Sequence, residues 1–224
     1  MRWQDNNRAL ANDSNDWNWH REIKEISLGR SVDLSFGGEI REQFRYYSHL
    51  NFGDVPAGAN DEDIYLQHRF LLHSDILFGK FCRIFLQVNS CHANGRNSDL
   101  HQVDRDDLGL MQAFADLNMG TNLKIQFRLG RQEFSYGMER ILALRDGPTI
   151  RQNFDGVRVS FSYNRLNIDV LAAKPVLYKT GVFDNKWRRK DYFLGSYITT
   201  SVLDKNTVDL YYFNASFNNA VFAS

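Results

Sequence analysis

The chain has 224 residues with 27 basic and 27 acidic side chains, so its formal net charge is zero. A neutral chain lacks the strongly basic surface that nucleic-acid binding usually requires, and we expect no nucleic-acid partner. No stretch approaches 18 consecutive apolar residues, which excludes a transmembrane helix but not the alternating strands of a membrane barrel.

The chain begins with a polar segment, residues 1–28, which contains Trp3, Trp17 and Trp19 and is predicted to be irregular. Met1 is followed by polar residues rather than by the apolar stretch of a secretory leader. If the rest of the chain is a membrane domain, its leader is therefore expected to be missing from this sequence.

Nine strands are predicted from residue 32 onward, because apolar and polar side chains alternate with a period of two. The first two are Val32–Tyr47 and Ile64–Phe78. Four later segments have one face that is wholly apolar or aromatic: Cys82, Ile84, Leu86 and Val88; Leu123, Ile125, Phe127 and Leu129; Val157, Val159, Phe161 and Tyr163; and Leu166, Ile168, Val170 and Ala172. The remaining strands are predicted at Leu110–Met119, Asp191–Ser201 and Thr207–Phe217.

The connections between these strands alternate in length. Tight turns at Gly79, Gly120–Asn122 and Asn164–Arg165 alternate with long loops such as 91–107 and 133–156. Outer-membrane barrels have short periplasmic turns and long extracellular loops. The pattern predicts an all-β fold, an antiparallel up-and-down meander of about nine strands that forms part of a large transmembrane β-barrel. Residues 1–28 would be a periplasmic N-terminal segment, and residues 29–224 an incomplete outer-membrane barrel.

A soluble β-barrel or sandwich is the alternative, because its strands also alternate, with the apolar face inward. Alternation does not say which face meets lipid, but a soluble barrel gives no reason for its loops to alternate in length. In a membrane barrel, the convex face should expose the apolar set: Ile84, Leu86, Val88, Ile125, Phe127, Val159 and Ile168. If these residues formed the best-buried cluster, the soluble alternative would be correct.

No motif indicates a metal site, a cofactor or an enzyme. Asp104, Asp106 and Asp107 form an acidic cluster, but the glycine and glutamate of an EF-hand loop are missing. The six histidines lack zinc-binding spacing, and there is no nucleophile motif or defensible carboxylate pair. Cys82 and Cys91 fall on one predicted strand, about 30 Å apart, which is too far for a disulfide.

The polar face of the strands would line the lumen, and alternation assigns to it seven basic and five acidic side chains: Arg41, Arg45, Arg69, Arg83, Lys124, Arg128 and Arg158, with Asp33, Glu39, Asp75, Asp116 and Asp169. The excess of two positive charges favours an anionic solute. Charges of both signs on a porin wall can also simply pair across neighbouring strands. We expect Arg83, Lys124, Arg128 and Arg158 to form one patch, with Asp116 and Asp169 nearby.

The longest predicted loop, 133–156, carries many charges. Arg145, Arg151 and Asp155 are candidate constriction residues if the loop folds into the lumen; an outward surface loop is the alternative. Arg131 falls on the apolar face, where a charge costs roughly 2–4 kcal/mol at mid-membrane. It should therefore lie at the extracellular rim, or a bulge at Gly130 should turn it inward.

Several short motifs occur in a fixed order along the chain: Arg69–Asp75 (RFLLHSD), Ala93–Arg96 (ANGR), Gln112–Leu117 (QAFADL), Arg145–Pro148 (RDGP) and Phe154–Arg158 (FDGVR). In order and spacing they resemble the alginate export family of outer-membrane channels over nearly the whole chain. The resemblance implies a large monomeric β-barrel, surrounded by membrane lipid, in the outer membrane of a Gram-negative bacterium.

The resemblance also implies a function, which is export or passage of an anionic polysaccharide or sugar acid such as alginate, with no catalysis and no cofactor. A porin for other solutes is an alternative within the same class, and a soluble binding module is one from another class. Family barrels have about twice as many strands, and single-chain bacterial barrels have an even number. The chain is therefore expected to lack strands beyond its C-terminal end.

Overall fold

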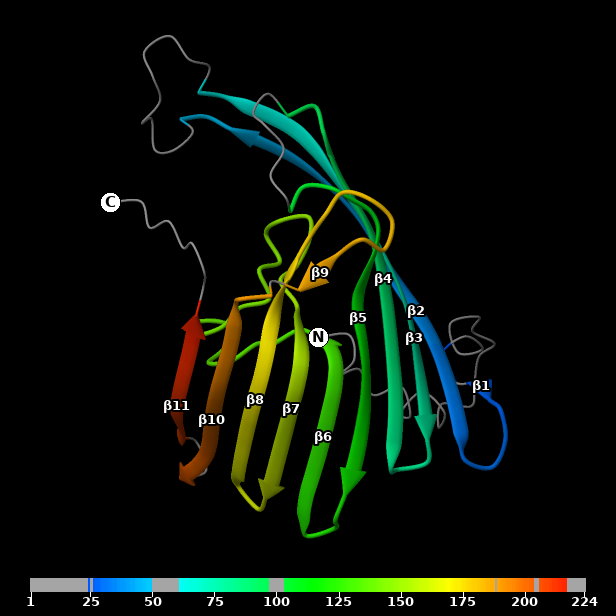
Figure 1. The fold of residues 1–224 in the computed structure, drawn as a ribbon, viewed down its shortest axis with the longest axis vertical. Coiled ribbons are helices and arrows are strands. Elements are labelled where there is room, and N and C mark those ends of the chain that lie inside the picture. Colours follow the sequence, from blue (N-terminus) through cyan, green and yellow to red (C-terminus); the bar gives the residue numbers. More distant parts are fainter. Residues whose placement is uncertain are drawn as a thin grey trace.

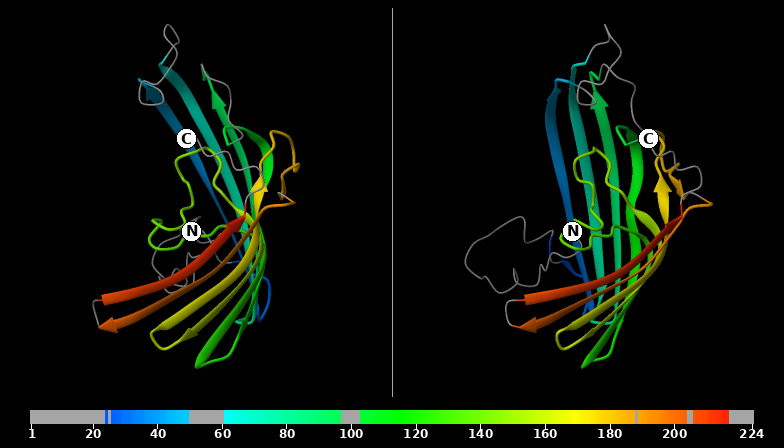
Figure 2. Two further views of the ribbon diagram at one scale, coloured as in Figure 1. Left: turned by 60° about the vertical axis from the view of Figure 1, so that its left-hand side comes forward. Right: turned by 90° about the vertical axis from the view of Figure 1, so that its left-hand side faces the viewer.

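The computed structural model describes residues 24, 26–49, 61–96, 103–187, 189–203 and 206–216. These residues form one curved antiparallel sheet (Figures 1 and 2). Most of the polar segment predicted at 1–28 lies outside the described residues. Within the described part of the chain, no helix is long and apolar enough to cross a membrane.

The sheet has eleven strands, nine of which are ten residues or longer and correspond to the nine predicted from the sequence. They are β1 (Ile26–Ser27), β2 (Val32–Tyr47), β3 (Asp63–Phe78), β4 (Cys82–Asn94), β5 (Asp106–Met119), β6 (Leu123–Gln132), β7 (Phe154–Tyr163), β8 (Leu166–Leu177), β9 (Lys186–Trp187), β10 (Tyr192–Leu203) and β11 (Asn206–Ser216).

The strands follow one another in space as they do in the chain, from β1 to β8 and then β10 and β11, while the two-residue β9 pairs with β8. Each pairing is antiparallel, as hairpin connections require. The predicted all-β meander is therefore confirmed. The described strands form an open trough rather than a closed barrel, as expected for part of a larger barrel.

The connections alternate in length as the sequence predicts. Short turns at 79–81, 120–122 and 164–165 lie at one end of the sheet, at the bottom of Figure 1, and the long connections lie at the other end. Two loops are shorter than predicted. β4 ends at Asn94 and β5 begins at Asp106, which shortens the loop predicted at 91–107. β7 begins at Phe154, so the longest loop spans 133–153 rather than 133–156.

The convex face of the trough is apolar. Phe70 and Leu72 of β3 are 44% and 47% exposed, and Leu86 of β4 is 43% exposed. The other residues expected on this face are half-buried, and none belongs to a buried cluster: Ile84, Val88, Ile125, Phe127, Val159 and Ile168. An apolar face of this extent needs lipid or another apolar partner. The pattern contradicts the soluble alternative, in which these residues would be the core.

The concave face is where side chains are buried, and most of them are polar. Arg128 is the largest fully buried side chain in the described residues, and Gln87, Gln112 and Glu133 are also fully buried. A polar interior that faces an apolar exterior is the arrangement of a membrane barrel. Cys82 and Cys91 are both free, as predicted.

Candidate functional site

The concave face carries the candidate site, because the loop 133–153 folds over it (Figure 2, yellow-green). The loop follows β6 and returns to the wall at β7, its neighbour in the sheet. Of the two alternatives left open by the sequence, the structure therefore has the loop on the lumen side. Two anchors fix the ends of the loop, and an ion-pair cluster holds its middle.

The first anchor is aromatic. Phe134 and Tyr136, just after β6, pack in one buried cluster with Phe154, Leu171 and Phe193. The ring centroids of Phe134 and Phe154 are 5.2 Å apart, and those of Phe154 and Phe193 are 5.5 Å apart. Aromatic pairs at such distances add about 0.5–1.5 kcal/mol each to the free energy of burial. The start of the loop is thus part of the wall.

The second anchor holds the end of the loop. Ile150 packs with Cys91, Val176 and Tyr178 in a second buried cluster. The Tyr178 hydroxyl donates to Asn153 Oδ1 at 2.6 Å. Asn153 Nδ2 in turn donates to the carbonyl oxygen of Met111 at 2.5 Å. These bonds tie residues 150–153 to β5 and to the segment that follows β8.

Between the anchors, the carboxylate of Asp146 meets three guanidinium groups. Arg151 Nε lies 2.6 Å from Asp146 Oδ1, Arg69 Nη1 lies 2.9 Å from the same oxygen, and Arg41 Nη1 lies 3.2 Å from Oδ2. Burial raises the pKa of Asp146, but the hydrogen bonds and charges of Arg151 and Arg69 outweigh burial and lower it overall. Arg45 adds a hydrogen bond to the carbonyl oxygen of Gly147.

Two further carboxylates, Glu39 and Glu133, offset part of the positive charge of these arginines. Glu39 accepts hydrogen bonds from Arg69 Nε at 3.1 Å and Nη2 at 2.6 Å. Glu133 is fully buried at the start of the loop, with Arg151 Nη1 3.9 Å away and Gln112 donating at 3.2 Å. Burial raises the pKa of Glu133 to about 7, although the charge of Arg151 opposes the shift. Near neutral pH, the cluster therefore carries more positive than negative charge.

A row across the middle of the sheet contains Arg83, Asp116, Arg128 and Arg158, each in register with the next. The expectation that these arginines share the concave face is met. Arg83 makes two hydrogen bonds to Asp75, at 2.7 and 2.6 Å. Arg128 does the same to Asp116, at 2.6 and 2.7 Å, and both side chains are fully buried.

The central row is thus not the free cationic patch that the sequence suggests. Arg128 lies 3.7 Å from the ring centre of Phe114 and presents no charge to solvent. Arg158 Nη2 donates to Gln126 Oε1 at 2.9 Å. Lys124 is exposed and lies nearer the short turns, in register with Ser162 rather than with the arginines. Arg83 and Arg128 thus follow the alternative considered from the sequence, in which charges on the wall pair across neighbouring strands.

The β8–β11 part of the concave face is aromatic, which sequence reasoning missed. Asp169, a predicted lumen residue, accepts a hydrogen bond from the Tyr136 hydroxyl at 2.9 Å. The ring centroids of Tyr197 and Tyr136 are 4.8 Å apart, and the Tyr197 hydroxyl donates a hydrogen bond to Asp209 Oδ2 at 2.5 Å. Phe193, Tyr197, Tyr211 and Phe213 occur at odd positions of β10 and β11, a signal that alternation could have revealed.

One of the three predicted constriction residues needs correction. Asp155 is in β7 rather than in the loop, and it pairs with Arg131 on the convex face at 2.7 and 2.8 Å. Arg145 lies in the loop, where its side chain is exposed and its φ is 55°, and its role in a constriction stays a prediction. Arg151 lies in the loop as predicted. The register is continuous through Gly130, so there is no bulge, and Arg131 lies at the loop end of β6.

The acidic cluster that follows β4 is neutralised by its neighbours. Arg96 contacts both Asp63 and Asp104, and Arg105 Nε donates to Asp107 at 2.9 Å. Asp106 accepts hydrogen bonds from Asn89 and Asn185. In the described part of the chain, no group of three or more His, Cys, Asp or Glu side chains is arranged to hold a metal ion.

Comparison with known proteins gives one match. No curated protein and no solved structure matches the chain. The sequence model of the family described as "Alginate export" matches residues 32–223, a span that includes every long strand of the sheet. The order of motifs, the meander with an apolar outer face and this match agree. The chain belongs to the alginate export family, whose members are outer-membrane β-barrel transport channels.

Proposed function

We propose that this chain forms part of a passive outer-membrane channel of a Gram-negative bacterium that passes an anionic polysaccharide or sugar acid such as alginate. The observation that carries the proposal is the carboxylate of Asp146 held among Arg41, Arg69 and Arg151 on the concave face. The protein supplies electrostatic attraction and a loop whose middle is held by ion pairs, and no covalent bond is made or broken.

Asp146 occupies the place that a uronate carboxylate would take. Guanidinium groups bind carboxylates strongly through paired hydrogen bonds, whatever the source of the carboxylate. The side chain of Asp146 is 51% exposed and that of Arg41 is 24% exposed, so a solute can reach this cluster. Arg69 and Arg151 are only 2% and 10% exposed, so either would be costly to leave without a carboxylate. A solute carboxylate would pair with the same guanidinium groups, so it can replace Asp146 without leaving them unpaired and release the middle of the loop.

A porin for other solutes is the second candidate, and the central row favours it. The Arg83–Asp75 and Arg128–Asp116 pairs cancel charge at that level of the wall. A pore lined only by such pairs would discriminate weakly between anions and cations. The two candidates differ in whether the Asp146 cluster controls selectivity.

The test is the conductance of the purified protein in planar bilayers, with oligouronate added as a blocker. Arg41→Glu should shift the reversal potential from anion towards cation selectivity and weaken the block about tenfold, the loss expected for one charge-assisted contact. Asp146→Asn should strengthen the block, because the competing carboxylate is removed. Arg105→Glu, a charge reversal at the exposed Arg105–Asp107 pair, is the matched control. Unchanged selectivity and block in Arg41→Glu would favour the general porin.

A further inference from the structure

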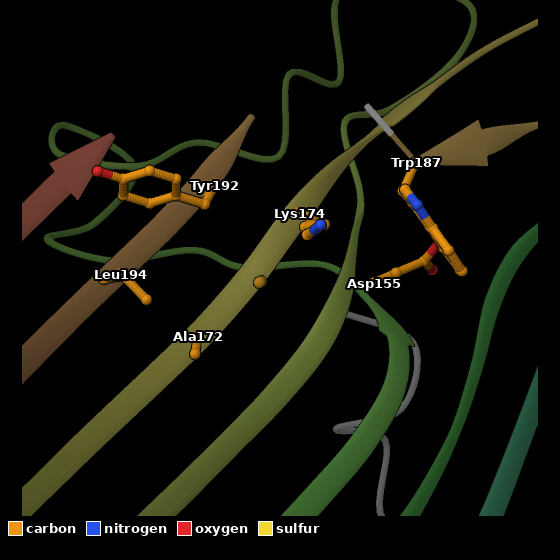
Figure 3. Close-up of a pocket in the computed structure, with 7 residues that line it drawn as sticks. Asp155, Ala172, Lys174, Trp187, Tyr192 and Leu194 are labelled. Carbon is orange, nitrogen blue, oxygen red and sulfur yellow. The ribbon is translucent and has the colours of Figure 1, made fainter. Parts of the chain in front are cut away.

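The convex face carries a hollow near the loop end of the sheet, between β7, β8 and β10 (Figure 3). It has a volume of about 440 Å³ and is lined by Asp155, Ala172, Ala173, Lys174, Trp187, Tyr192 and Leu194. Trp187 and Tyr192 are 57% and 42% exposed. Exposed aromatic side chains near the ends of the strands are typical of the interfacial girdles of membrane barrels.

A second hollow adjoins the first along the strands. Its lining is mostly aliphatic: Val157, Val159, Val170, Leu171, Ala172, Leu194, Gly195, Ser196 and Tyr212. Ala172 and Leu194 line both hollows, so the two form one groove that leads from the loop end towards the middle of the sheet. The small side chain of Ala172 leaves the junction open.

The loop end of this groove is positively charged. Arg131, Asp155 and Lys174 are in register across β6, β7 and β8, and Asp155 pairs with Arg131. Lys174 Nζ donates to the carbonyl oxygen of Arg189 at 3.1 Å, and no described carboxylate pairs with it. Among the described residues of the connection from 178 to 191, four are basic and two are acidic: Lys179, Lys186, Arg189 and Lys190, with Asp184 and Asp191.

We propose that this groove binds a phosphorylated glycolipid of the surrounding membrane. Its phosphate would contact Lys174 and the basic connection, its sugar would lie against Trp187 and Tyr192, and one acyl chain would fill the aliphatic hollow. Phosphate favours cations that retain unused donors, and aliphatic surface at membrane depth favours acyl chains. The site is on the outer face and goes beyond the proposed transport function, since it is independent of the solute.

The experiment is native mass spectrometry of the protein purified in detergent and titrated with lipid A, a diphosphorylated glucosamine lipid. Its dephosphorylated form and inorganic phosphate are the comparison probes. Lys174→Glu should reduce lipid A binding about tenfold or more, because a charge-assisted contact is lost and repulsion is added. Ala172→Phe should reduce binding by blocking the junction of the two hollows.

Two variants serve as matched controls. Lys80→Glu reverses an exposed charge at the opposite end of the sheet, and Ala115→Phe enlarges an exposed alanine on the convex face of β5. Both should bind lipid A like the wild type. Lys174→Gln, with a milder change, covers the case in which Lys174→Glu does not fold.

Each remaining result would overturn the proposal. Equal binding of dephosphorylated lipid would show that phosphate is not recognised. Displacement of lipid A by millimolar inorganic phosphate would indicate a simple anion site, and equal losses in Ala172→Phe and Ala115→Phe would indicate unspecific lipid contact. Conductance and oligouronate block should stay at wild-type values in Lys174→Gln, so failure here is distinguishable from failure of the transport proposal.

Discussion

The two halves of the concave face differ in chemistry although they belong to one sheet. Across β2–β6 the buried side chains include many ion pairs and amides, such as Arg69 with Glu39 and Arg128 with Asp116, beside apolar residues such as Phe85. Across β8–β11 they are aromatic rings, with Phe193 stacked on Phe213 at 5.4 Å. The loop 133–153 contacts both halves.

The loop is held differently by each half. Its start is packed against the aromatic half, where exchange with a solute would expose apolar surface at about 25 cal/mol per Å². Its middle is held by the charged half through Asp146, whose partners can exchange for another carboxylate. Met138, Glu139 and Arg145 have φ of 52°, 66° and 55°, which is costly for residues other than glycine and is found at sites under functional constraint. We therefore expect the start of the loop, packed on the aromatic half, to act as a hinge, and the Asp146 ion pairs with the charged half to be the contacts that break when the loop moves.

The largest effect is expected from Asp116→Ala in the charged half. It leaves Arg128 fully buried without its carboxylate, a change that typically costs about 3–5 kcal/mol. Urea unfolding in lipid vesicles measures the loss. Asp209→Ala, which removes an exposed carboxylate from the aromatic half, is the control and should cost less than about 1 kcal/mol. Equal losses would mean that the two halves do not differ in the way described.

The stability of the protein should depend on pH through Glu133, which lies where the charged and aromatic halves meet. Its pKa is raised from 4.5 to about 7 by burial, so the folded protein holds a proton that the unfolded chain releases. Glu133 therefore contributes stability that is full below about pH 4.5 and is lost as pH rises through about 7. The carboxyl of Asp146, with its lowered pKa, changes below this window.

Urea unfolding at pH 5 and pH 8 tests this contribution, with Arg151, Arg69 and Gln112 as the nearby groups left intact. The wild type should lose up to about 3 kcal/mol over this range, following about 1.4 kcal/mol per unit of pKa shift. Glu133→Gln keeps the shape of the side chain and should lose markedly less. A mutant with the full wild-type loss would assign the effect to other groups.

More of the fold than of the candidate site can be predicted from the sequence. Alternation predicts Val32–Tyr47 with its observed bounds, because lipid outside and polar groups inside impose a period of two. The Arg128–Asp116 pair also follows from local information, since the turn 120–122 places these residues opposite each other. The roles of Asp146 and Glu133 do not follow, because they depend on the path of a loop that no periodic pattern specifies. Asp155 was misassigned because the start of β7 was placed too late.

The smallest expected effect is a difference in unfolding free energy between two tyrosine substitutions within the aromatic half. Tyr136, 7% exposed, donates to Asp169, whereas Tyr197 donates to Asp209 at an exposed position. Tyr136→Phe leaves a half-buried carboxylate without this donor and should cost about 1–2 kcal/mol. Tyr197→Phe should cost about 0.5 kcal/mol or less, because water replaces its hydroxyl. Both substitutions keep the ring, so packing is matched and vesicle unfolding compares the hydrogen bonds alone. If Tyr197→Phe lowered the free energy of unfolding more than Tyr136→Phe did, the start of the loop would not be the hinge. The aromatic rings of β10 and β11 would then stabilise the wall without the loop.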